Sequence, residues 1–516
     1  MLSKTIAAAV NSIDAIRVDV EVSVEWGSGF TIVGLPDTAV KESAERVRCA
    51  IEQAGFEFPR KWVVINLSPA DIKKEGSAYD LPIAIGVLAS DEKLPTEKLS
   101  RYMMMGELSL DGTLKPIKGA LPMAILAREL KLDGFILPKA NALEAAVVNK
   151  LNIYGVESID EVIAFLSDTA TLEPTVVDTR GEFAKAQGIF PYDFSEVKGQ
   201  ENVKRAFEVA CAGGHNILLV GSPGSGKSMM AKRLPSIMPP LSLAEALETT
   251  KIHSVTGKLP GGTTLLTARP FRAPHHTISP VALVGGGTYP TPGEISLAHN
   301  GVLFLDELPE FNRNVLEVMR QPLEDRVISI SRAKYSIEYP ASFMLVASMN
   351  PCPCGYYGHP TKPCVCTEHQ RFNYMSKISG PLLDRIDLQI EVQPVEFEQM
   401  SSKESGVTSA EIRERVVKAR RIQEQRFKNA PGVYCNAQMT PTMLHQYAEP
   451  DAEGLEKLRD AMERMNMSAR AYDRILKVAR TIADLEASPT VRPHHIMEAI
   501  SYRNLDRSSY FGSSLQ

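Results

Sequence analysis

The eight residues from Gly221 to Ser228 constrain this chain more than any other feature of its sequence. They read GSPGSGKS and fit the pattern G-x-x-x-x-G-K-[ST], in which glycines let backbone N–H groups turn inward around phosphate oxygens. The apolar run Ile217–Val220 predicts a short buried strand before the motif, and a helix is expected after it. We therefore expect an α/β fold with a nucleotide phosphate site. The expected phosphate-binding residues are Gly221, Ser222, Pro223, Gly224, Ser225, Gly226, Lys227 and Ser228.

Two acidic residues downstream complete the expected pocket. The apolar run Val302–Leu305 predicts a buried strand that ends at Asp306 and Glu307. Lys227 is expected to reach the β- and γ-phosphates, and Ser228 and Asp306 to hold Mg²⁺. Glu307 is placed to polarise the attacking water as a general base. In the alternative interpretation the two acids only cap a helix. The expected cofactors are ATP and Mg²⁺.

Composition excludes several other classes of protein. The chain has 516 residues, 44% apolar and 23% charged, which argues against wholesale disorder, a collagen-like repeat and a coiled-coil rod. Its net charge of −5 gives no global indication of nucleic-acid binding, so such a function would need local basic patches. No stretch approaches the roughly 18 apolar residues of a membrane helix, and the run Thr5–Val10 is too short for a secretory signal. We expect a cytoplasmic protein that does not contact a membrane.

The pattern of apolar residues predicts about three domains, as the length also favours. Residues 1–170 mix strand and helix patterns, and the polar segment 171–193 predicts a linker. A second α/β domain is expected over residues 194–400, then a helical domain over 401–505 and a flexible tail over 506–516. The expected helices of the third domain are 410–427, 441–447, 451–465, 469–485 and 494–503.

The phosphate loop and the acidic strand end belong to a larger pattern. With Asn350, which follows the expected strand Phe343–Met349, they resemble Walker A, Walker B and sensor 1 of an AAA+ ATPase. The resemblance implies that Asn350 orients the lytic water beside the γ-phosphate.

Residues 381–387, which read PLLDRID, resemble an element of the magnesium-chelatase and MCM-helicase branch of that superfamily. The branch usually has Phe at the position of Ile386. Its arginine enters the neighbouring subunit's site, so the resemblance implies that Arg385 acts in trans within a hexameric ring. The alternative is an ion pair with Asp384 or Asp387.

Residues 468–474, which read SARAYDR, resemble the sensor 2 region. The resemblance makes Arg470 a candidate for contact with the γ-phosphate, and Arg474, one helical turn on, competes for that role. A solvated helix arginine without such a role is the alternative.

Two further segments resemble features of the same branch. Residues 249–294 resemble its helix-2 insert, and the alternating segment Arg326–Tyr339 resembles its presensor-1 β-hairpin. In MCM-type helicases that hairpin points into the ring channel, which implies that Arg332 and Lys334 face DNA phosphates. Alternatively both are ordinary surface cations.

Four of the seven cysteines fall within 15 residues, in a loop expected over 351–369. The spacing is C-x-C, nine residues, C-x-C, with glycines and prolines interspersed. Four thiolates in one short loop predict a tetrahedral Zn²⁺ site, with reduced, metal-free thiols as the alternative. The expected ligands are Cys352, Cys354, Cys364 and Cys366.

The N-terminal domain resembles the Lon-protease C-terminal domain over residues 72–82 and 106–112. Lon cuts peptides with a Ser–Lys dyad, but this chain aligns Ala78 with the serine position and Leu121 with the lysine position. Ser77 and Lys118 are close in sequence but out of register. Since a dyad needs both groups within hydrogen-bond reach, we expect a catalytically inactive collar for assembly or nucleic-acid binding.

Over nearly its whole length the chain resembles the ComM/YifB family of magnesium-chelatase-like ATPases. The resemblance implies an ATP-dependent hexameric DNA motor or helicase that promotes branch migration when incoming single strands recombine in natural transformation. It implies single-stranded and branched DNA as partners, together with recombination proteins. The alternatives are a magnesium-chelatase-like ATPase subunit and an ATP-dependent Lon-like protease.

Overall fold

A computed structural model describes residues 2–188, 190–260, 262–287, 290–332, 335–395, 406–465 and 467–503. The chain forms two compact units, of which the first combines Met1–Ala186 with Ser242–Thr267. The second combines Gln187–Leu241 with Ala268–Gln516. The second α/β domain, expected over 194–400, is therefore interrupted, because Ser242–Thr267 folds with the N-terminal residues. The tail expected over 506–516 lies outside the described residues.

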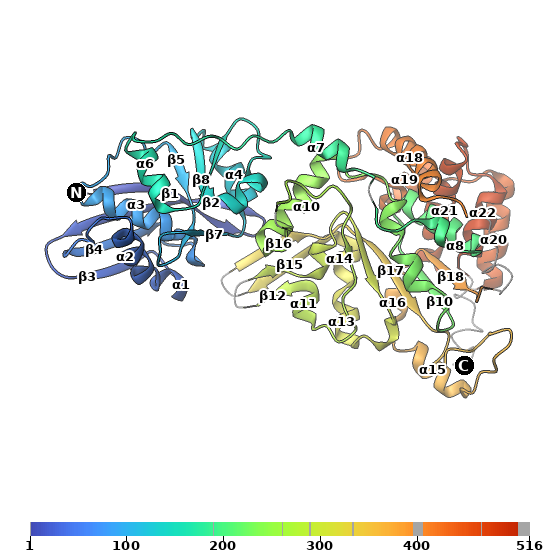
Figure 1. Cartoon of the computed structure of the whole chain (residues 1–516). Helices are drawn as coiled ribbons and strands as arrows, with labels where there is room; N and C mark the ends of the chain where they lie inside the picture. Colours follow the sequence, from blue (N-terminus) through green and yellow to red (C-terminus); the bar gives the residue numbers. More distant parts are fainter. Residues whose placement is uncertain are drawn as a thin grey trace. The chain divides into compact units, whose positions relative to one another are not determined.

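A seven-stranded mixed sheet, in the order β3-β4-β2-β1-β5-β8-β9, forms the first unit (Figure 1). Its strands, with the small pair β6–β7, are β1 Leu2–Asn11, β2 Asp14–Glu25, β3 Gly29–Val33, β4 Trp62–Ser68, β5 Tyr102–Met104, β6 Glu107–Leu108, β7 Leu114–Lys115, β8 Gly134–Pro138 and β9 Asn152–Val156. Its helices are α1 Thr38–Lys41, α2 Ser43–Gln53, α3 Asp80–Ser90, α4 Ala120–Glu129, α5 Lys139–Ala145, α6 Ile159–Leu166, α7 Thr179–Ala186 and α10 Leu243–Thr256.

Apolar residues on one face of the sheet build the core of this unit. Val18, Val20 and Val22 alternate along β2 and are fully buried, as the period of a half-buried strand requires. Every residue of α3 is buried, and this helix packs against β1 and β2. A helix that is buried on every side has no solvent face, which explains why the apolar run Leu81–Leu88 shows no helical periodicity.

The segment expected to be a linker contains α7. The Asp178 carboxylate accepts a hydrogen bond of 3.0 Å from the backbone N–H of Gly181, which satisfies one of the free donors at the start of the helix. Phe183 packs against the apolar core of the first unit. The polar composition of the segment therefore concealed a short helix with one apolar anchor.

A five-stranded parallel sheet, in the order β11-β14-β17-β10-β18, forms the second unit. The strands of the unit, including the pairs β12–β13 and β15–β16, are β10 Ile217–Gly221, β11 Phe271–Arg272, β12 Gly285–Gly286, β13 Thr291–Pro292, β14 Val302–Leu305, β15 Val327–Arg332, β16 Tyr335–Pro340, β17 Met344–Met349 and β18 Leu388–Val392. The helices before β18 are α8 Glu201–Gly213, α9 Lys227–Ala231, α11 Pro280–Val284, α12 Glu294–Leu297, α13 Arg313–Val318, α14 Arg320–Asp325, α15 Glu368–Met375 and α16 Gly380–Leu383.

The helices expected after residue 408 are confirmed to within about two residues at each end. They are α18 Ser409–Arg426, α19 Pro441–Tyr447, α20 Ala452–Met465, α21 Ala469–Leu485 and α22 Pro493–Ser501. Thr408 and Glu411 form a capping box at α18, and the Thr440 side chain caps α19. These hydroxyls satisfy orphan N–H groups and so stabilise the starts of both helices.

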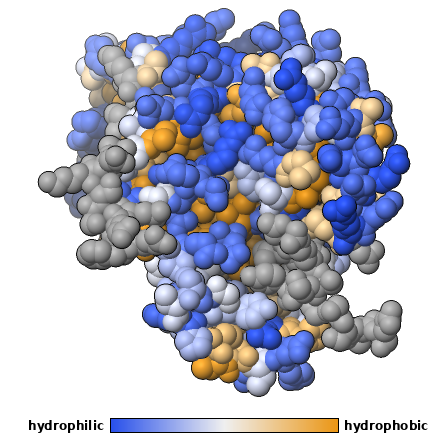
Figure 2. All heavy atoms as spheres, turned by 90° about the vertical axis from the view of Figure 1, so that its right-hand side faces the viewer, coloured by the Kyte–Doolittle hydropathy of each residue, from blue (hydrophilic) through white to orange (hydrophobic). Residues whose placement is uncertain are grey.

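The side of the molecule that carries α20 and α22 in Figure 1 faces the viewer in Figure 2. Its surface is mostly hydrophilic, with apolar residues gathered toward the middle. Leu455 of α20 and Met497 of α22 are among the apolar side chains exposed to solvent. In the described part of the chain, no helix combines the length and the apolar character needed to cross a membrane.

We predict that Gly86→Ala destabilises the first unit, although alanine normally stabilises a helix relative to glycine by about 1 kcal/mol. A Cβ at Gly86 of α3 would lie 2.7 Å from Val22 Cγ2 of β2, so the two elements would have to separate. We expect a net loss of about 1–2 kcal/mol in the free energy of unfolding, measured by urea denaturation.

The double variant Gly86→Ala/Val22→Ala tests whether the clash with Val22 causes the loss of stability. Removing the Val22 methyl groups opens the space that the new Cβ needs, so the double variant should lose less stability than the sum of the two single changes. Additive effects, or a Gly86→Ala variant as stable as the parent, would contradict the clash.

Candidate nucleotide site

Three neighbouring parallel strands of the second unit bring the expected site residues to one edge of the sheet. β10 ends at Gly221, where the phosphate loop begins, and β14 and β17 are followed by Asp306 and Asn350. β17 pairs in parallel with both β10 and β14, with Val220 opposite Met349 and Leu305 opposite Ala347. Carboxyl ends of adjacent parallel strands lie side by side, so residues more than 80 positions apart in sequence meet there.

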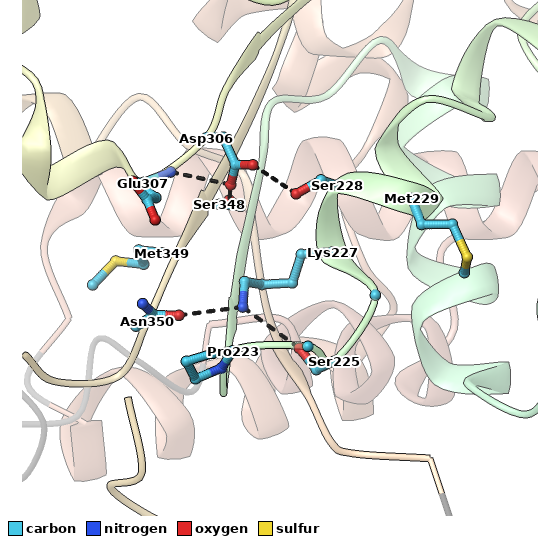
Figure 3. Close-up of a pocket in the computed structure, with 12 residues that line it drawn as sticks. Pro223, Ser225, Lys227, Ser228, Met229, Asp306, Glu307, Ser348, Met349 and Asn350 are labelled. Carbon is cyan, nitrogen blue, oxygen red and sulfur yellow. Dashed lines mark hydrogen bonds between the residues drawn. The ribbon is translucent and has the colours of Figure 1, made fainter. Parts of the chain in front are cut away.

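A pocket of about 370 Å³ opens at this edge (Figure 3). Its lining consists of Pro223, Gly224, Ser225, Gly226, Lys227, Ser228, Met229, Asp306, Glu307, Ser348, Met349 and Asn350. Nearly all of the expected phosphate-binding residues are in this set, as are Asp306, Glu307 and Asn350. Gly221 and Ser222 take part through their backbone carbonyls, which accept hydrogen bonds from Lys227.

The Lys227 ammonium lies at the centre of the phosphate loop. Its Nζ donates to Gly221 O at 2.7 Å and to Ser222 O at 2.9 Å, and it lies 3.4 Å from Asn350 Oδ1. Figure 3 shows Lys227 and Asn350 directed toward each other. Burial lowers the pKa of Lys227 below its usual value, and the nearby carboxylates of Asp306 and Glu307 oppose that effect. A phosphate bound here would stabilise the charged ammonium further.

Asp306 is held from two sides by hydroxyl groups. Ser228 Oγ donates to Asp306 Oδ2 at 2.6 Å, and Ser348 Oγ donates to Asp306 Oδ1. A carboxylate and a serine hydroxyl in contact are oxygen ligands of the kind that Mg²⁺ prefers. Ser348 did not emerge from the sequence, since no motif marks it. Its position two residues before Asn350, on the same face of β17, is the signal that could have found it.

Glu307 has an unusual backbone. Its φ of 55° places it in the left-handed region, which costs a non-glycine residue about 1–2 kcal/mol. The Glu307 carboxylate lies 3.8 Å from His276 Nδ1, and the side chain is more than half exposed toward the pocket. Such strain at a pocket is common where a side chain must be aimed at a substrate. His276 lies in a loop between β11 and α11, and sequence analysis did not identify it.

Arg385 lies outside this pocket. The guanidinium is buried, forms an ion pair with Glu324 of α14, and donates from Nη1 to Pro381 O at 2.5 Å. The ion pair expected with Asp384 or Asp387 as the alternative role of Arg385 is formed with Glu324 instead. Glu324 lies 61 residues before Arg385, and no local pattern connects the two.

Arg470 and Arg474 also lie outside the pocket lining of the described chain. Arg470 Nη1 is 3.4 Å from Asp384 Oδ2, and its side chain is 65% exposed. Arg474 Nη1 donates to Asp387 Oδ1 at 2.8 Å. Burial raises the pKa of Asp387, but Arg474 and His215 outweigh burial and hold it well below its usual range. Arg474 is therefore committed to a buried ion pair, while Arg470 is exposed.

The hairpin expected from the alternating segment is present. β15 and β16 pair antiparallel from Val327 opposite Pro340 to Arg332 opposite Tyr335. Lys334, and the side chain of Arg332, lie outside the described residues.

The four clustered cysteines lie together in the loop after β17. Their sulfur atoms all lie within 4.8 Å of one another, and the Sγ atoms of Cys352, Cys354 and Cys364 are separated by 3.4–3.7 Å. Thiolates bound at about 2.3 Å to one tetrahedral zinc ion are about 3.8 Å apart, so this geometry fits Zn²⁺. The fourth cysteine, Cys366, accepts a hydrogen bond from the backbone N–H of Cys354 at 3.3 Å.

Backbone N–H groups also surround the Cys354 sulfur. Burial raises the pKa of this thiol, but hydrogen bonds from the backbone of Tyr356 and Val365 outweigh burial and lower the pKa to about 6. Donors of this kind stabilise thiolate ligands and orient them toward a metal. These donors favour the thiolate form of Cys354.

In the first unit, the groups considered for a protease dyad do not form one. The Ser77 hydroxyl donates to the Glu107 carboxylate. The aliphatic chain of Lys118 lies beside Gly257, with Cε 3.0 Å from the place where a Cβ of that glycine would be. The Ser77 hydroxyl is thus bonded to a carboxylate, whereas a Ser–Lys dyad needs that hydroxyl beside a lysine base.

Three family models, all for the magnesium chelatase subunit ChlI, match successive parts of the chain. The family model for the magnesium chelatase subunit ChlI matches residues 193–400. A second model for subunit ChlI of Mg-chelatase matches residues 18–141, and a model for the C-terminal part of that subunit matches residues 406–503.

Individual relatives cover more of the chain. YifB of Salmonella typhimurium is 42% identical over 508 residues, which are 97% of this chain and 96% of that protein. Competence protein ComM of Haemophilus influenzae is 42% identical over 501 residues, 96% of each chain. The magnesium-chelatase 38 kDa subunit of Rhodobacter capsulatus is 27% identical over 187 residues, 33% of this chain and 52% of that subunit.

We predict that Ser348→Ala weakens Mg²⁺-dependent nucleotide binding. The variant removes a donor that fixes the Asp306 carboxylate, and losing such an outer contact typically costs about tenfold or more in metal affinity. Titrating Mg²⁺ against a fluorescent, non-hydrolysable ATP analogue should show a half-saturating Mg²⁺ concentration raised about tenfold. Ser342→Ala, a change at the amino end of the same strand, is the control. Equal Mg²⁺ dependence in the two variants would refute the assigned role of Ser348.

Proposed function

This chain belongs to the ComM/YifB family of magnesium-chelatase-like proteins, and from that premise we propose that it is an ATP-driven motor acting on DNA. The observation that carries the proposal is the contact of Ser228 with Asp306 in the pocket that also holds Lys227 and Asn350. That combination of a lysine, a serine–aspartate pair and a polar amide is suited to binding and hydrolysing a nucleoside triphosphate. The name of the Haemophilus relative associates it with competence, and we extend this association to DNA uptake and recombination here.

Each residue of the pocket has a proposed part in hydrolysis. The backbone of the phosphate loop and Lys227 bind the β- and γ-phosphates, and Ser228 and Asp306 hold Mg²⁺. The metal ion, when bound, neutralises charge on the phosphate oxygens. Glu307 accepts a proton from the attacking water, and the Asn350 amide orients that water.

We further propose that the active protein is a homo-hexamer. In that ring Arg385 leaves Glu324 and enters the adjoining subunit's site, where a permanently charged guanidinium stabilises charge on the γ-phosphate. Arg470 is the second candidate for that contact, since its side chain is 65% exposed and lies 3.4 Å from Asp384 Oδ2. Arg474 is the weaker candidate because it is held by the buried Asp387 carboxylate.

DNA is proposed to pass through the ring, where the β15–β16 hairpin corresponds to the presensor-1 hairpin of helicases. Arg332 and Lys334 are the residues proposed to contact phosphates. Residues 1–170 are proposed to be an inactive Lon-like collar, in keeping with the contact between Ser77 and Glu107. The proposed partners are single-stranded and branched DNA together with recombination proteins, and the proposed location is the cytoplasm.

The cysteine loop is proposed to bind one structural Zn²⁺ through Cys352, Cys354, Cys364 and Cys366. Three of the sulfur–sulfur separations are close to those of a tetrahedral thiolate site, and backbone N–H groups support the sulfur charge. The ion, when bound, crosslinks the two C-x-C pairs of the loop.

Two other activities have less support. A magnesium-chelatase-like role rests on the Rhodobacter relative, whose similarity covers a third of this chain, whereas ComM is similar over nearly all of it. A Lon-like protease would need a serine beside a lysine, and Ser77 is bonded to Glu107 instead. We therefore favour the DNA motor.

The proposed motor activity predicts ATP-dependent branch migration. With a three-stranded DNA junction as substrate, the wild-type protein should convert the junction to products only when ATP is present. Glu307→Gln should bind ATP with near-normal affinity but give no products, because the amide cannot accept a proton from water. Conversion by Glu307→Gln at the wild-type rate, or none by wild-type protein that hydrolyses ATP, would contradict the proposal.

The proposed action of Arg385 in trans predicts rescue by mixing. Arg385→Ala and Glu307→Gln should each be nearly inactive as ATPases. In mixed rings, about one quarter of the interfaces would combine an intact Glu307 with an intact Arg385 from the adjoining subunit, so hydrolysis should return. Adding Lys227→Ala to the Arg385→Ala subunit should abolish the recovery. If simple mixing restores no activity although mixed rings form, Arg385 does not act in trans.

A further inference from the structure

The cysteine loop, residues 351–369, is continuous with the nucleotide site. It begins directly after Asn350, and its first cysteine, Cys352, is completely buried. Cys354 and Cys366 line a second cavity of about 820 Å³ together with Glu307 and Asn350. The proposed metal ligands and the proposed catalytic groups therefore share one wall.

The loop also meets the phosphate loop through Gly355. A Cβ at this position would lie 2.5 Å from Pro223 Cδ and 2.7 Å from Pro223 Cγ, closer than real Cβ contacts. The φ of Gly355 is +83°, in the left-handed region that favours glycine. Only a residue without a side chain lets the two loops approach this closely, and Pro223 itself lines the nucleotide pocket.

Gly355 is tied to the cysteine cluster by the same backbone. Its N–H donates to Cys352 O at 2.9 Å and also interacts with the Cys352 sulfur. The residue that touches the phosphate loop is thus part of the turn that presents a proposed metal ligand. Moving the Cys352 thiolate would move Gly355 with it.

A further contact runs through α15, which starts two residues after Cys366. Tyr374 of this helix is nearly buried, and the backbone N–H of Asn350 is directed at its hydroxyl. Burial raises the pKa of Tyr374 and this N–H opposes the rise. The cysteine cluster is therefore connected to the phosphate loop on one side and to Asn350 on the other.

We propose that the cysteine loop is a positioning element of the nucleotide site, so that zinc binding and nucleotide binding strengthen each other. The inference rests on the nucleotide and zinc sites proposed above. With the four sulfur atoms gathered, Gly355 packs against Pro223 and fixes the phosphate loop in its binding conformation. When the sulfur atoms separate, that support is lost. Because coupling between two binding sites is reciprocal, each ligand must change the affinity for the other by the same factor.

Equilibrium binding tests this coupling without measuring hydrolysis. The affinity for a fluorescent, non-hydrolysable ATP analogue is measured with zinc-loaded protein and with protein stripped by a zinc-selective chelator, in excess Mg²⁺. The affinity for Zn²⁺ is measured by competition with a chromogenic chelator, with and without the analogue. We expect both affinities to rise about fivefold or more when the other ligand is present, and by equal factors.

Two glycines of the same loop provide matched variants. Gly355→Ala and Gly358→Ala impose similar backbone strain, since the φ of Gly358 is +77°. A Cβ at Gly358 would lie 3.8 Å from its nearest neighbour, Glu391 Oε1, which is an ordinary contact distance. Of the two variants, only Gly355→Ala therefore places a methyl group against Pro223. Gly355→Ala should lose most of the coupling and bind the analogue more weakly in its zinc-loaded form. Gly358→Ala should keep the coupling.

Three results would overturn the inference. They are a less than twofold change of analogue affinity on zinc removal, equal coupling in the two glycine variants, and failure of the wild-type chain to bind zinc. If the analogue binds and DNA stimulates hydrolysis while zinc has no effect, the motor function stands and only the coupling fails. If the analogue does not bind zinc-loaded protein at all, both proposals fail.

Discussion

The alignment of three parallel strands is the constraint on which the rest of this structure depends. β10, β14 and β17 lie side by side and end on the same edge of the sheet, so the phosphate loop, Asp306 and Asn350 face one pocket. Strands buried on both faces are rigid supports, and all five residues of β10 and all six of β17 are buried. The pocket needs this rigidity because it holds unfavourable features, a desolvated Lys227 and a left-handed Glu307.

The carboxyl end of β17 contributes residues to three neighbouring clusters of polar or sulfur-containing side chains. Within five residues, the chain after and within β17 supplies Ser348 to Asp306, Asn350 to Lys227, and Cys352 to the cysteine cluster. A displacement of this strand end would therefore change the proposed metal contact, the amide of Asn350 proposed to orient water, and the loop that approaches Pro223. This placement gives a physical reason for a cysteine cluster beside a nucleotide site.

The sequence was most informative where chemistry depends on local spacing. Gly221 to Ser228, Asp306 and the four cysteines each belong to a short pattern, which is why they could be proposed as site residues from the sequence. In the structure most of the phosphate loop and Asp306 line one pocket, and the four sulfur atoms lie within 4.8 Å of one another. Contacts between distant segments were not predictable. Ser348 contacts Asp306, His276 lies beside Glu307, and Arg385 pairs with Glu324, in each case across at least 30 positions.

In the fold, too, features set by local sequence were predictable and features set by contacts between distant segments were not. The starts of α18 and α19 were predicted to within one residue, and the hydroxyls of Thr408 and Thr440 cap these starts within one turn of chain. The placement of α10 in the first unit was missed, because it depends on packing against α4 and on the Ser254–Glu144 contact. Those partners lie more than 100 positions earlier in the chain, and no local signal identifies them.

If hydrolysis in this pocket drives movement on DNA, as we propose, then DNA should change the rate of hydrolysis. This is tested by measuring ATP hydrolysis by the purified full-length protein with and without single-stranded DNA, at fixed Mg²⁺ and low salt. We expect a rate severalfold higher with DNA, and a stimulation that weakens as salt rises because phosphate contacts are screened. An ATPase rate that is unchanged by DNA at every salt concentration, in protein that hydrolyses ATP and forms rings, would contradict this proposal.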